Sequence, residues 1–76
     1  MRVYGWRVCK DWDRTGKIFV ITDNYLTAER KAEAALKPGE LLGLELSINQ
    51  ITETEWTCIS KLLCLSTECV IRHEGK

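Results

Sequence analysis

The sequence has little of what enzymes, membrane proteins and nucleic-acid-binding proteins depend on. It holds one histidine and one proline in 76 residues, and its eleven basic residues balance its eleven acidic ones. The neutral total argues against a polyanion as partner. The five glycines are dispersed, so the chain has no glycine-rich loop that could hold a phosphate. No apolar run approaches the about 18 residues of a membrane span, and we expect no membrane partner.

The residues that are present indicate one folded domain. Hydrophobic residues make up 45% of the chain and charged residues 29%, a balance typical of globular proteins rather than of disordered chains. The chain is too short for a second hydrophobic core, so we expect a single compact domain over residues 1–76. A chain of this length buries roughly 60% of its unfolded surface, which leaves little material for a deep enzyme pocket.

Four cysteines are present, at Cys9, Cys58, Cys64 and Cys69. An even number in a short secreted chain would indicate disulfides. Residues 1–7, however, lack the uninterrupted apolar stretch of a signal peptide and are typical of a first strand. We therefore expect free thiols in a reducing cytoplasm.

Two strands joined by a hairpin loop are expected at the start of the chain. Residues 2–10 alternate in side-chain character, as a strand does. Residues 17–22 form a continuous β-branched and aromatic run, which indicates a strand buried on much of both faces. Residues 11–16 between them have the turn chemistry of a hairpin loop.

The next segment changes to the period of a helix. Its apolar stripe consists of Ala28, Ala32, Ala35 and Leu36. Thr27 is the expected N-cap, and Glu33 and Lys37 have the spacing of a favourable helical pair. Pro38 and Gly39 should stop the helix, because proline disfavours helical geometry before it and glycine accepts a positive φ.

A strand and a second helix should follow. The strand is expected from an alternation of apolar residues, and its leucines 44 and 46 should lie in the core; the alternating residues are Leu42, Leu44, Leu46 and Ile48. Thr52 and Glu55 match a capping box, and we expect a helix over residues 53–64. The competing interpretation is a strand, because the segment Trp-Thr-Cys-Ile has high β-propensity. Residues 68–73 alternate again and should form a short closing strand.

The expected order of elements is therefore β-β-α-β-α-β. A hairpin followed by interspersed helices predicts an α+β fold, a single small domain with an antiparallel or mixed sheet and one or two helices packed on a face.

A zinc site is the most specific metal hypothesis. Its ligands would be Cys58, Cys64, Cys69 and His73, whose chemistry suits zinc. Structural zinc sites carry two to four residues between paired cysteines, whereas five separate Cys58 from Cys64. We favour the interpretation that these cysteines act as small hydrophobes, and we expect no metal and no cofactor.

Catalytic residues are scarce. His73 is the only histidine, and Cys69 lies four residues before it on the expected closing strand, about 13 Å away. That distance is too long for a hydrogen-bonded dyad. Asp11 and Asp13 lie in an exposed loop, where both carboxylates stay ionised. We therefore do not expect an enzyme.

Nucleic-acid binding by the first hairpin is the alternative function. Basic and aromatic residues interleave there, and a sheet with such residues can hold a backbone and stack bases; they are Arg2, Arg7, Lys10, Arg14 and Lys17 with Tyr4, Trp6, Trp12 and Phe19. The competing interpretation puts Tyr4, Trp6 and Val8 in the core beneath a helix.

Protein binding is the function that the sequence favours. Trp12 lies among the charged residues Asp11, Asp13 and Arg14 in the expected hairpin loop. A tryptophan ringed by charges has the composition of an interface hot spot. Tyr25, just before the first helix, is expected to extend the same surface. The competing interpretation is that Trp12 folds back over the edge of the sheet as part of the core.

The chain also resembles small proteins of phages and mobile elements, among them several anti-CRISPR families. The resemblance is carried by residues 6–8 (WRV), 16–20 (GKIFV), 26–35 (LTAERKAEAA) and 42–46 (LGLEL). It implies a stoichiometric inhibitor of a host defence complex, which works in the host cytoplasm without cofactor or catalytic residues. The partner would be a host protein or ribonucleoprotein complex, and a homodimer is compatible with this role. A small nucleic-acid-binding or regulatory protein and a structural subunit of a larger particle are the alternatives.

Overall fold

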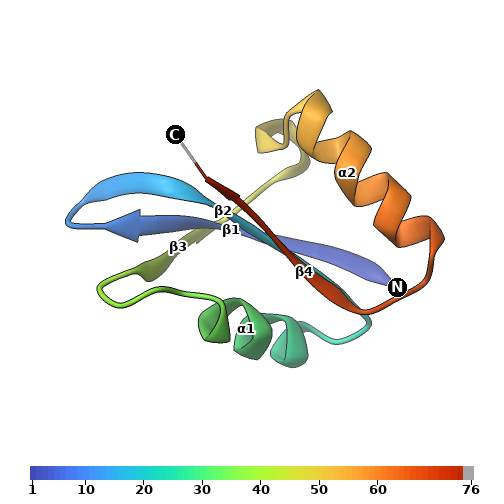
Figure 1. Ribbon diagram of the computed structural model, residues 1–76, viewed down its shortest axis with the longest axis horizontal. Coiled ribbons are helices and arrows are strands. Elements are labelled where there is room, and N and C mark those ends of the chain that lie inside the picture. The colour runs from blue at the N-terminus through green and yellow to red at the C-terminus, as the bar shows by residue number, and fades with distance from the viewer. Residues whose placement is uncertain (75–76) are drawn as a thin grey trace.

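A long hairpin of two strands forms the centre of the fold. The computed structural model describes residues 1–74, in which β1 (Arg2–Lys10) pairs antiparallel with β2 (Asp13–Thr22) (Figure 1). β3 (Leu41–Glu45) adds to the free side of β1, and β4 (Cys69–Glu74) adds to the free side of β2. The sheet order is β3-β1-β2-β4 with every neighbour antiparallel, which confirms the predicted α+β fold and element order.

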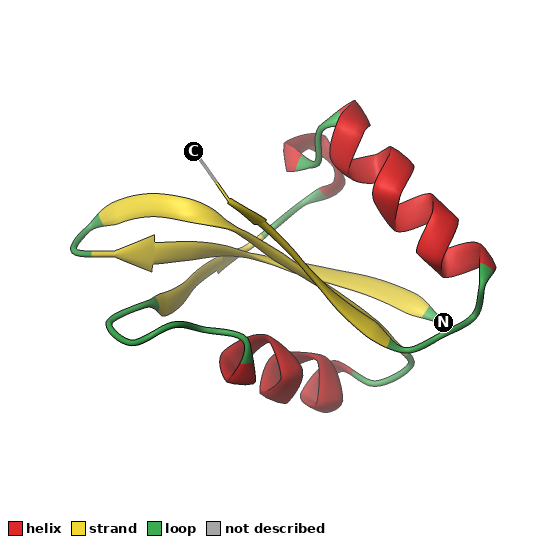
Figure 2. Ribbon diagram, in the orientation of Figure 1, coloured by secondary structure: helices red, strands yellow, loops and turns green. Residues whose placement is uncertain are grey.

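Two helices cover opposite faces of this sheet. α1 (Tyr25–Ala34) lies against one face and α2 (Glu53–Cys64) against the other, with a short 3₁₀ turn, η1 (Ile48–Gln50), before α2 (Figure 2). The reason lies in β2, where successive apolar side chains point to alternate faces. Because both faces of β2 are apolar, a single helical layer could not bury them.

The α1 face holds the larger core. Two alanines of α1 let the helix approach the sheet closely, and side chains of β1 and β2 fill the space beneath. The buried members are Trp6, Val8, Ile18, Val20, Ala28 and Ala32. Tyr4, Ala35, Leu36 and Leu42 pack around this group. The helical stripe expected from the sequence is thus the buried face of α1.

The α2 face holds a second core around fully buried Phe19, Ile21 and Ile59. Leu46 and Ile71 pack against this group from the chain segments beside the sheet centre. β2 therefore contributes alternate side chains to two separate cores. The prediction that residues 17–22 are buried on both faces is confirmed for residues 18–22, all of which are buried.

The start of α1 differs from the prediction. The helix begins at Tyr25, and its N-cap is Asn24, whose side-chain oxygen accepts a hydrogen bond from the Thr27 backbone N–H at 3.2 Å. The prediction of Thr27 as N-cap was wrong, because Asn24 can supply the same acceptor one turn earlier. The end of α1 also differs: the helix ends at Ala34 with Ala35 as its C-cap, before the predicted stop at Pro38 and Gly39. Gly39 has a φ of +85° in the loop that follows.

The start of α2 confirms the predicted capping box. Thr52 Oγ1 accepts a hydrogen bond from the Glu55 backbone N–H at 3.2 Å, and Glu55 Oε1 accepts one from the Thr52 backbone N–H at 2.8 Å. The helix then runs over the predicted residues, Glu53–Cys64. The competing strand interpretation was wrong. In the helix, the backbone N–H groups of Thr52 and Glu55 at its start both have side-chain acceptors.

β3 is shorter and less regular than its alternating leucines predict. Trp6 pairs with Glu45 and Val8 with Leu42, so β3 holds one extra residue between these pairs. This bulge breaks the alternation: the side chain of Leu44 is 80% exposed, and the prediction that it lies in the core was wrong. Leu46 packs in the α2-face core, as predicted for that residue.

The hairpin loop is also shorter than the expected residues 11–16. Only Asp11 and Trp12 separate β1 from β2, and both have positive φ, 51° and 70°. Thr15 is the extra residue of a second bulge, because Val8 pairs with Gly16 while Cys9 pairs with Arg14. The strand therefore starts four residues earlier than predicted, and the turn projects beyond it.

Candidate protein-binding surface at the hairpin tip

Trp12 is held in solvent by the geometry of its turn. A two-residue turn with positive φ at both positions is type I′, the turn whose twist matches that of the two strands. Its second position favours glycine, because a side chain there crowds the backbone. Trp12 occupies that position and is fully exposed (102%). The interpretation that Trp12 folds back into the core was wrong.

A hollow opens beside the indole of Trp12. It has a volume of about 480 Å³ and is lined by Cys9, Asp11, Trp12, Gly39, Leu41 and Leu42. A second hollow of about 590 Å³ lies toward the end of α1 and shares Leu41 and Leu42 with the first. The surface beside the tip is thus concave and largely apolar, the shape that receives a partner's side chain.

The charged residues expected at the tip are exposed on either side of Trp12 in the chain. Asp11, Asp13 and Arg14 are all exposed, and the two strand residues pair with Lys10 and Cys9 across the hairpin. Charges of both signs therefore flank Trp12 along the chain. Polar residues around an apolar anchor are common in protein interfaces.

Tyr25 lies elsewhere. Its ring packs against those of Tyr4 and Trp6, with centroids 5.6 and 6.0 Å away. Trp12 is six residues beyond Trp6, or about 20 Å of strand, and Figure 1 shows the turn and the start of α1 at different ends of the molecule. Partial burial, and then the carboxylates of Glu45 and Glu29, raise the pKa of the Tyr25 hydroxyl. The prediction that Tyr25 extends the Trp12 surface was wrong.

Two leucines of β3 belong to the exposed surface and were missed by the sequence analysis. Leu41 is 71% exposed and lines the hollow beside Trp12, and Leu44 is 80% exposed at the bulge. The adjacent pair Leu41 and Leu42 carried a signal. Successive residues of a strand point to opposite faces, so Leu41 had to face away from the core that Leu42 joins.

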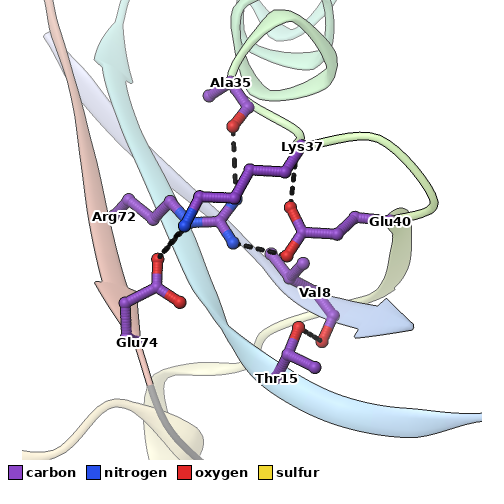
Figure 3. A network of polar contacts seen from close by, with 7 residues as sticks. All are labelled: Val8, Thr15, Ala35, Lys37, Glu40, Arg72 and Glu74. Atoms are coloured by element: carbon purple, nitrogen blue, oxygen red, sulfur yellow. Dashed lines mark hydrogen bonds and ion pairs between the residues drawn. The ribbon is translucent and has the colours of Figure 1, made fainter. Parts of the chain in front are cut away.

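A polar network holds the loop that carries one wall of the hollow. Figure 3 shows Arg72 of β4 reaching across to this loop: it donates a hydrogen bond to the Ala35 carbonyl at 3.2 Å and pairs with Glu40 and Glu74. Glu40 also accepts a hydrogen bond from the Lys37 backbone N–H at 2.7 Å. Hydrogen bonds from Arg72 and then from Lys37 lower the pKa of Glu40 to about 2. The loop leading into β3 is therefore anchored on a charged pair.

A second polar cluster fixes the opposite face. Lys17 Nζ donates to Glu55 Oε1 at 2.9 Å and to the Gln50 carbonyl at 2.7 Å. Burial acts to raise the pKa of Glu55, but hydrogen bonds from Thr52 and from Lys17 outweigh it and the pKa is lowered. These contacts tie η1 and the start of α2 to β2.

Burial of aromatic rings and the ion pair of Lys17 weaken the case for nucleic-acid binding by the first hairpin. Trp6 is 4% exposed and Phe19 is fully buried, so neither ring is available to stack on a base. The charge of Lys17 is directed to Glu55. Of the four aromatic residues that suggested this function, Trp12 alone is fully exposed.

The cysteines are free and scattered. Cys58 and Cys64 are exposed on α2, whereas Cys9 and Cys69 are half-buried on the sheet. His73 packs edge-on against the ring of Phe19, with centroids 5.9 Å apart. Among residues 1–74, no three side chains of histidine, cysteine, aspartate or glutamate gather as metal ligands would. Within the same residues, neither helix has the length and apolar character needed to cross a membrane.

No model of a protein family, no curated protein and no solved structure matches the chain.

Proposed function

We propose that this protein is a non-enzymatic protein-binding module whose contact surface is the hairpin tip. Trp12 is the central anchor, and Asp11, Asp13 and Arg14 form its rim. The observation that carries the proposal is the full exposure of Trp12 at a turn position that favours glycine. An aspartate followed by glycine would make a better turn, so a tryptophan there is explained by contact with another molecule.

The hollow beside Trp12 supports the same function. An anchor residue gains most when the partner seals it from water, and a concave neighbour allows a partner's side chain to pack against the indole. Leu41 and Leu42 provide the apolar floor for that side chain. The charges around the tip would mainly set the rate of association and its dependence on salt.

The partner that we propose is a host defence complex, a protein or ribonucleoprotein assembly of the CRISPR type in the host cytoplasm. The support is the resemblance to small phage and mobile-element proteins together with an apolar anchor on a small scaffold. Inhibition would be stoichiometric, because a bound domain of this size can block a groove or a moving part without chemistry. A standard interface needs about 800 Å² from each partner, which such a domain can offer.

Phage plaque formation tests this proposal directly. The protein is produced in bacterial strains that each restrict a phage through one CRISPR type, with matched strains that lack the system. We expect plaques to be restored in at least one restricting strain and to be lost again with Trp12→Ala. Trp56→Ala is the matched control, since Trp56 is 39% exposed on α2 and outside the tip.

Capture of the complex gives a second measure. Tagged protein should retain the effector complex at a fixed stoichiometry, and Trp12→Ala should reduce the affinity about 30-fold or more, the effect of losing roughly 2 kcal/mol at a hot spot. If plaques are restored in none of the restricting strains, the proposal that the partner is a CRISPR complex is refuted. Equal binding by Trp12→Ala, or capture of nucleic acid alone, would refute the surface.

A further inference from the structure

α1 carries two carboxylates at positions that are unfavourable for the helix itself. Glu29 and Glu33 stand four residues apart, the spacing at which like charges on a helix repel each other. Glu33 is also the next-to-last residue of α1, where the negative end of the helix dipole disfavours an anion. The helix would therefore be more stable with a neutral residue at Glu33.

No cation of the fold compensates these two charges. Among residues 1–74, the ion pairs include neither Glu29 nor Glu33. The favourable pair expected between Glu33 and Lys37 does not form. α1 ends before Lys37, whose Nζ lies 3.7 Å from Glu74 Oε1 instead (Figure 3). The two carboxylates of α1 are therefore available to a cation from outside the fold.

The first carboxylate lies beside a partly exposed aromatic ring. Tyr25, at the start of α1, is 39% exposed. After partial burial, the carboxylates of Glu45 and then Glu29 raise the pKa of the Tyr25 hydroxyl, so both lie near it. The face of an aromatic ring attracts cations, and neighbouring carboxylates add to that attraction. This part of the surface therefore suits an ammonium or guanidinium group.

The second carboxylate lies beside apolar surface. Glu33 lines the hollow of about 590 Å³ at the end of α1, together with Leu36 and Leu42. Glu40 lines the same hollow, but its charge is paired with Arg72. A group that binds beside Glu33 therefore meets one unpaired negative charge and an apolar wall. This combination suits a basic residue followed by an apolar one.

We propose that the β3-facing side of α1 binds a basic, extended segment of a partner protein. Glu29 and Glu33 each face a lysine or arginine of that segment, and an apolar residue of the segment enters the hollow. The inference rests on the proposed function in taking a protein as the partner, and it uses carboxylates that the hairpin tip does not.

The spacing of the carboxylates defines the pattern of the segment. Four helical residues rise by about 6 Å, and alternate residues of an extended chain are about 6.6 Å apart. Basic residues at alternate positions therefore match Glu29 and Glu33. The whole of α1 is about 15 Å long, the reach of about five extended residues. A segment so short does not form a stable helix by itself, which favours the extended form.

Fluorescence anisotropy with a labelled peptide and the full chain tests the inference. The probe has the sequence Gly-Lys-Ser-Lys-Ser-Leu-Gly, and the control peptide has glutamate in place of both lysines. At low ionic strength we expect saturable binding of the basic peptide, with a dissociation constant below about 1 mM, and no binding of the acidic one. The affinity should fall as salt is added, because the contacts are between exposed charges.

Glu33→Lys is the informative variant. It should weaken binding of the basic peptide about ten-fold, because an attraction becomes a repulsion. Its melting temperature should not fall, since the substitution removes the repulsion by Glu29 and by the helix dipole. Glu53→Lys is the matched control: it changes the net charge equally at an exposed position in the first turn of α2. Its peptide binding should stay within about two-fold of the unaltered protein.

The outcomes separate this surface from the hairpin tip. Trp12→Ala should bind the basic peptide as the unaltered protein does. Absence of binding up to about 1 mM peptide overturns the inference, and so does equal weakening by Glu33→Lys and Glu53→Lys when both are folded. Loss of peptide binding in Trp12→Ala would assign the peptide to the tip and overturn the inference as well. The proposed function is tested separately, by the restoration of plaques.

Discussion

At Trp12, the stability of the turn and the proposed binding function favour different residues. A residue other than glycine in the left-handed region loses roughly 1 kcal/mol or more through crowding of its Cβ. The turn therefore carries strain at Trp12, whose φ is 70°. Such strain persists when the surrounding strands enforce the turn, as the paired β1 and β2 do here.

Replacing Trp12 with glycine should stabilise the protein. We expect the free energy of unfolding to rise by about 1 kcal/mol and the melting temperature by about 4–8 °C, because glycine adopts positive φ without crowding. Thermal melting measures this effect. Trp12→Ala keeps a Cβ in the same backbone region, so its stability should stay within about 0.5 kcal/mol of the unaltered protein. A loss of stability in Trp12→Gly would mean that the indole packs on the fold.

Leu44 and Leu46 show how one residue of bulge changes the role of a side chain. Leu46→Ala should lower the free energy of unfolding by about 2 kcal/mol, the low end for leucine, because Leu46 is half-buried in the α2-face core. Leu44→Ala should change it by less than about 0.5 kcal/mol. Urea unfolding of both variants measures the difference. Equal losses would place the register of β3 in error.

Among the helices, α1 depends on a cap outside its apolar stripe. Asn24→Ala should lower the free energy of unfolding by about 1 kcal/mol, because the Thr27 backbone N–H loses its acceptor. Thr27→Ala keeps that bond, since only the backbone of Thr27 takes part, and should have a much smaller effect. The two variants are compared by chemical unfolding. A larger effect of Thr27→Ala would restore Thr27 as the cap.

α1 and α2 have different sources of stability. α2 is stabilised at its start by the reciprocal bonds of Thr52 and Glu55, and then by Lys17, which reaches the same carboxylate from β2. α1 begins with a single side-chain cap and packs against the sheet through Ala28 and Ala32. The larger core is therefore what keeps the shorter helix in place.

For the molecule as a whole, the Arg72 network joins segments far apart in the chain. It links β4 to the end of α1 and to the loop before β3. β3 and β4 are the two opposite edge strands of the sheet. The hydrogen bonds of Arg72 with Glu40 and then Glu74 raise the pKa of the guanidinium, which stays charged throughout. The protonation of the carboxylates therefore decides whether the network holds.

Acid should weaken the fold in a defined range. The pKa of Glu40 is about 2 in the folded protein against 4.5 as its ordinary value, so its contribution is complete above about pH 4.5 and is lost as the pH falls toward 2. The lowered pKa values of Glu55, Glu68 and Glu74 have the same sign. We expect the melting temperature to fall across this range.

Glu40→Gln isolates the part of Glu40 in that response. Glutamine does not titrate, so the variant should melt lower at pH 7 and lose less on going to pH 2.5 than the unaltered protein does. Melting curves at several pH values measure both quantities. Parallel pH profiles for the two proteins would show that Glu40 does not carry the response.

Structural features that depend on residues close together in the sequence could be predicted from the sequence. The start of α2 follows from Thr52 and Glu55, which are three residues apart and satisfy each other's backbone. The buried stripe of α1 follows from helical spacing, and the charged setting of Trp12 follows from its neighbours. The position of Trp12 in an exposed hairpin turn could be predicted in this way, because it lies among local turn signals.

The remaining features depend on partners distant in the chain. The bulge in β3 is set by its pairing with β1, and it turned Leu44 from a predicted core residue into an exposed one. Tyr25 does not lie on the surface around Trp12, because its ring packs against Tyr4 and Trp6. Pairing register and ring packing minimise the free energy of contacts between separate segments, so periodicity within one segment cannot specify them. Local spacing therefore specified the elements, and contacts across the sheet specified which side chains reach solvent.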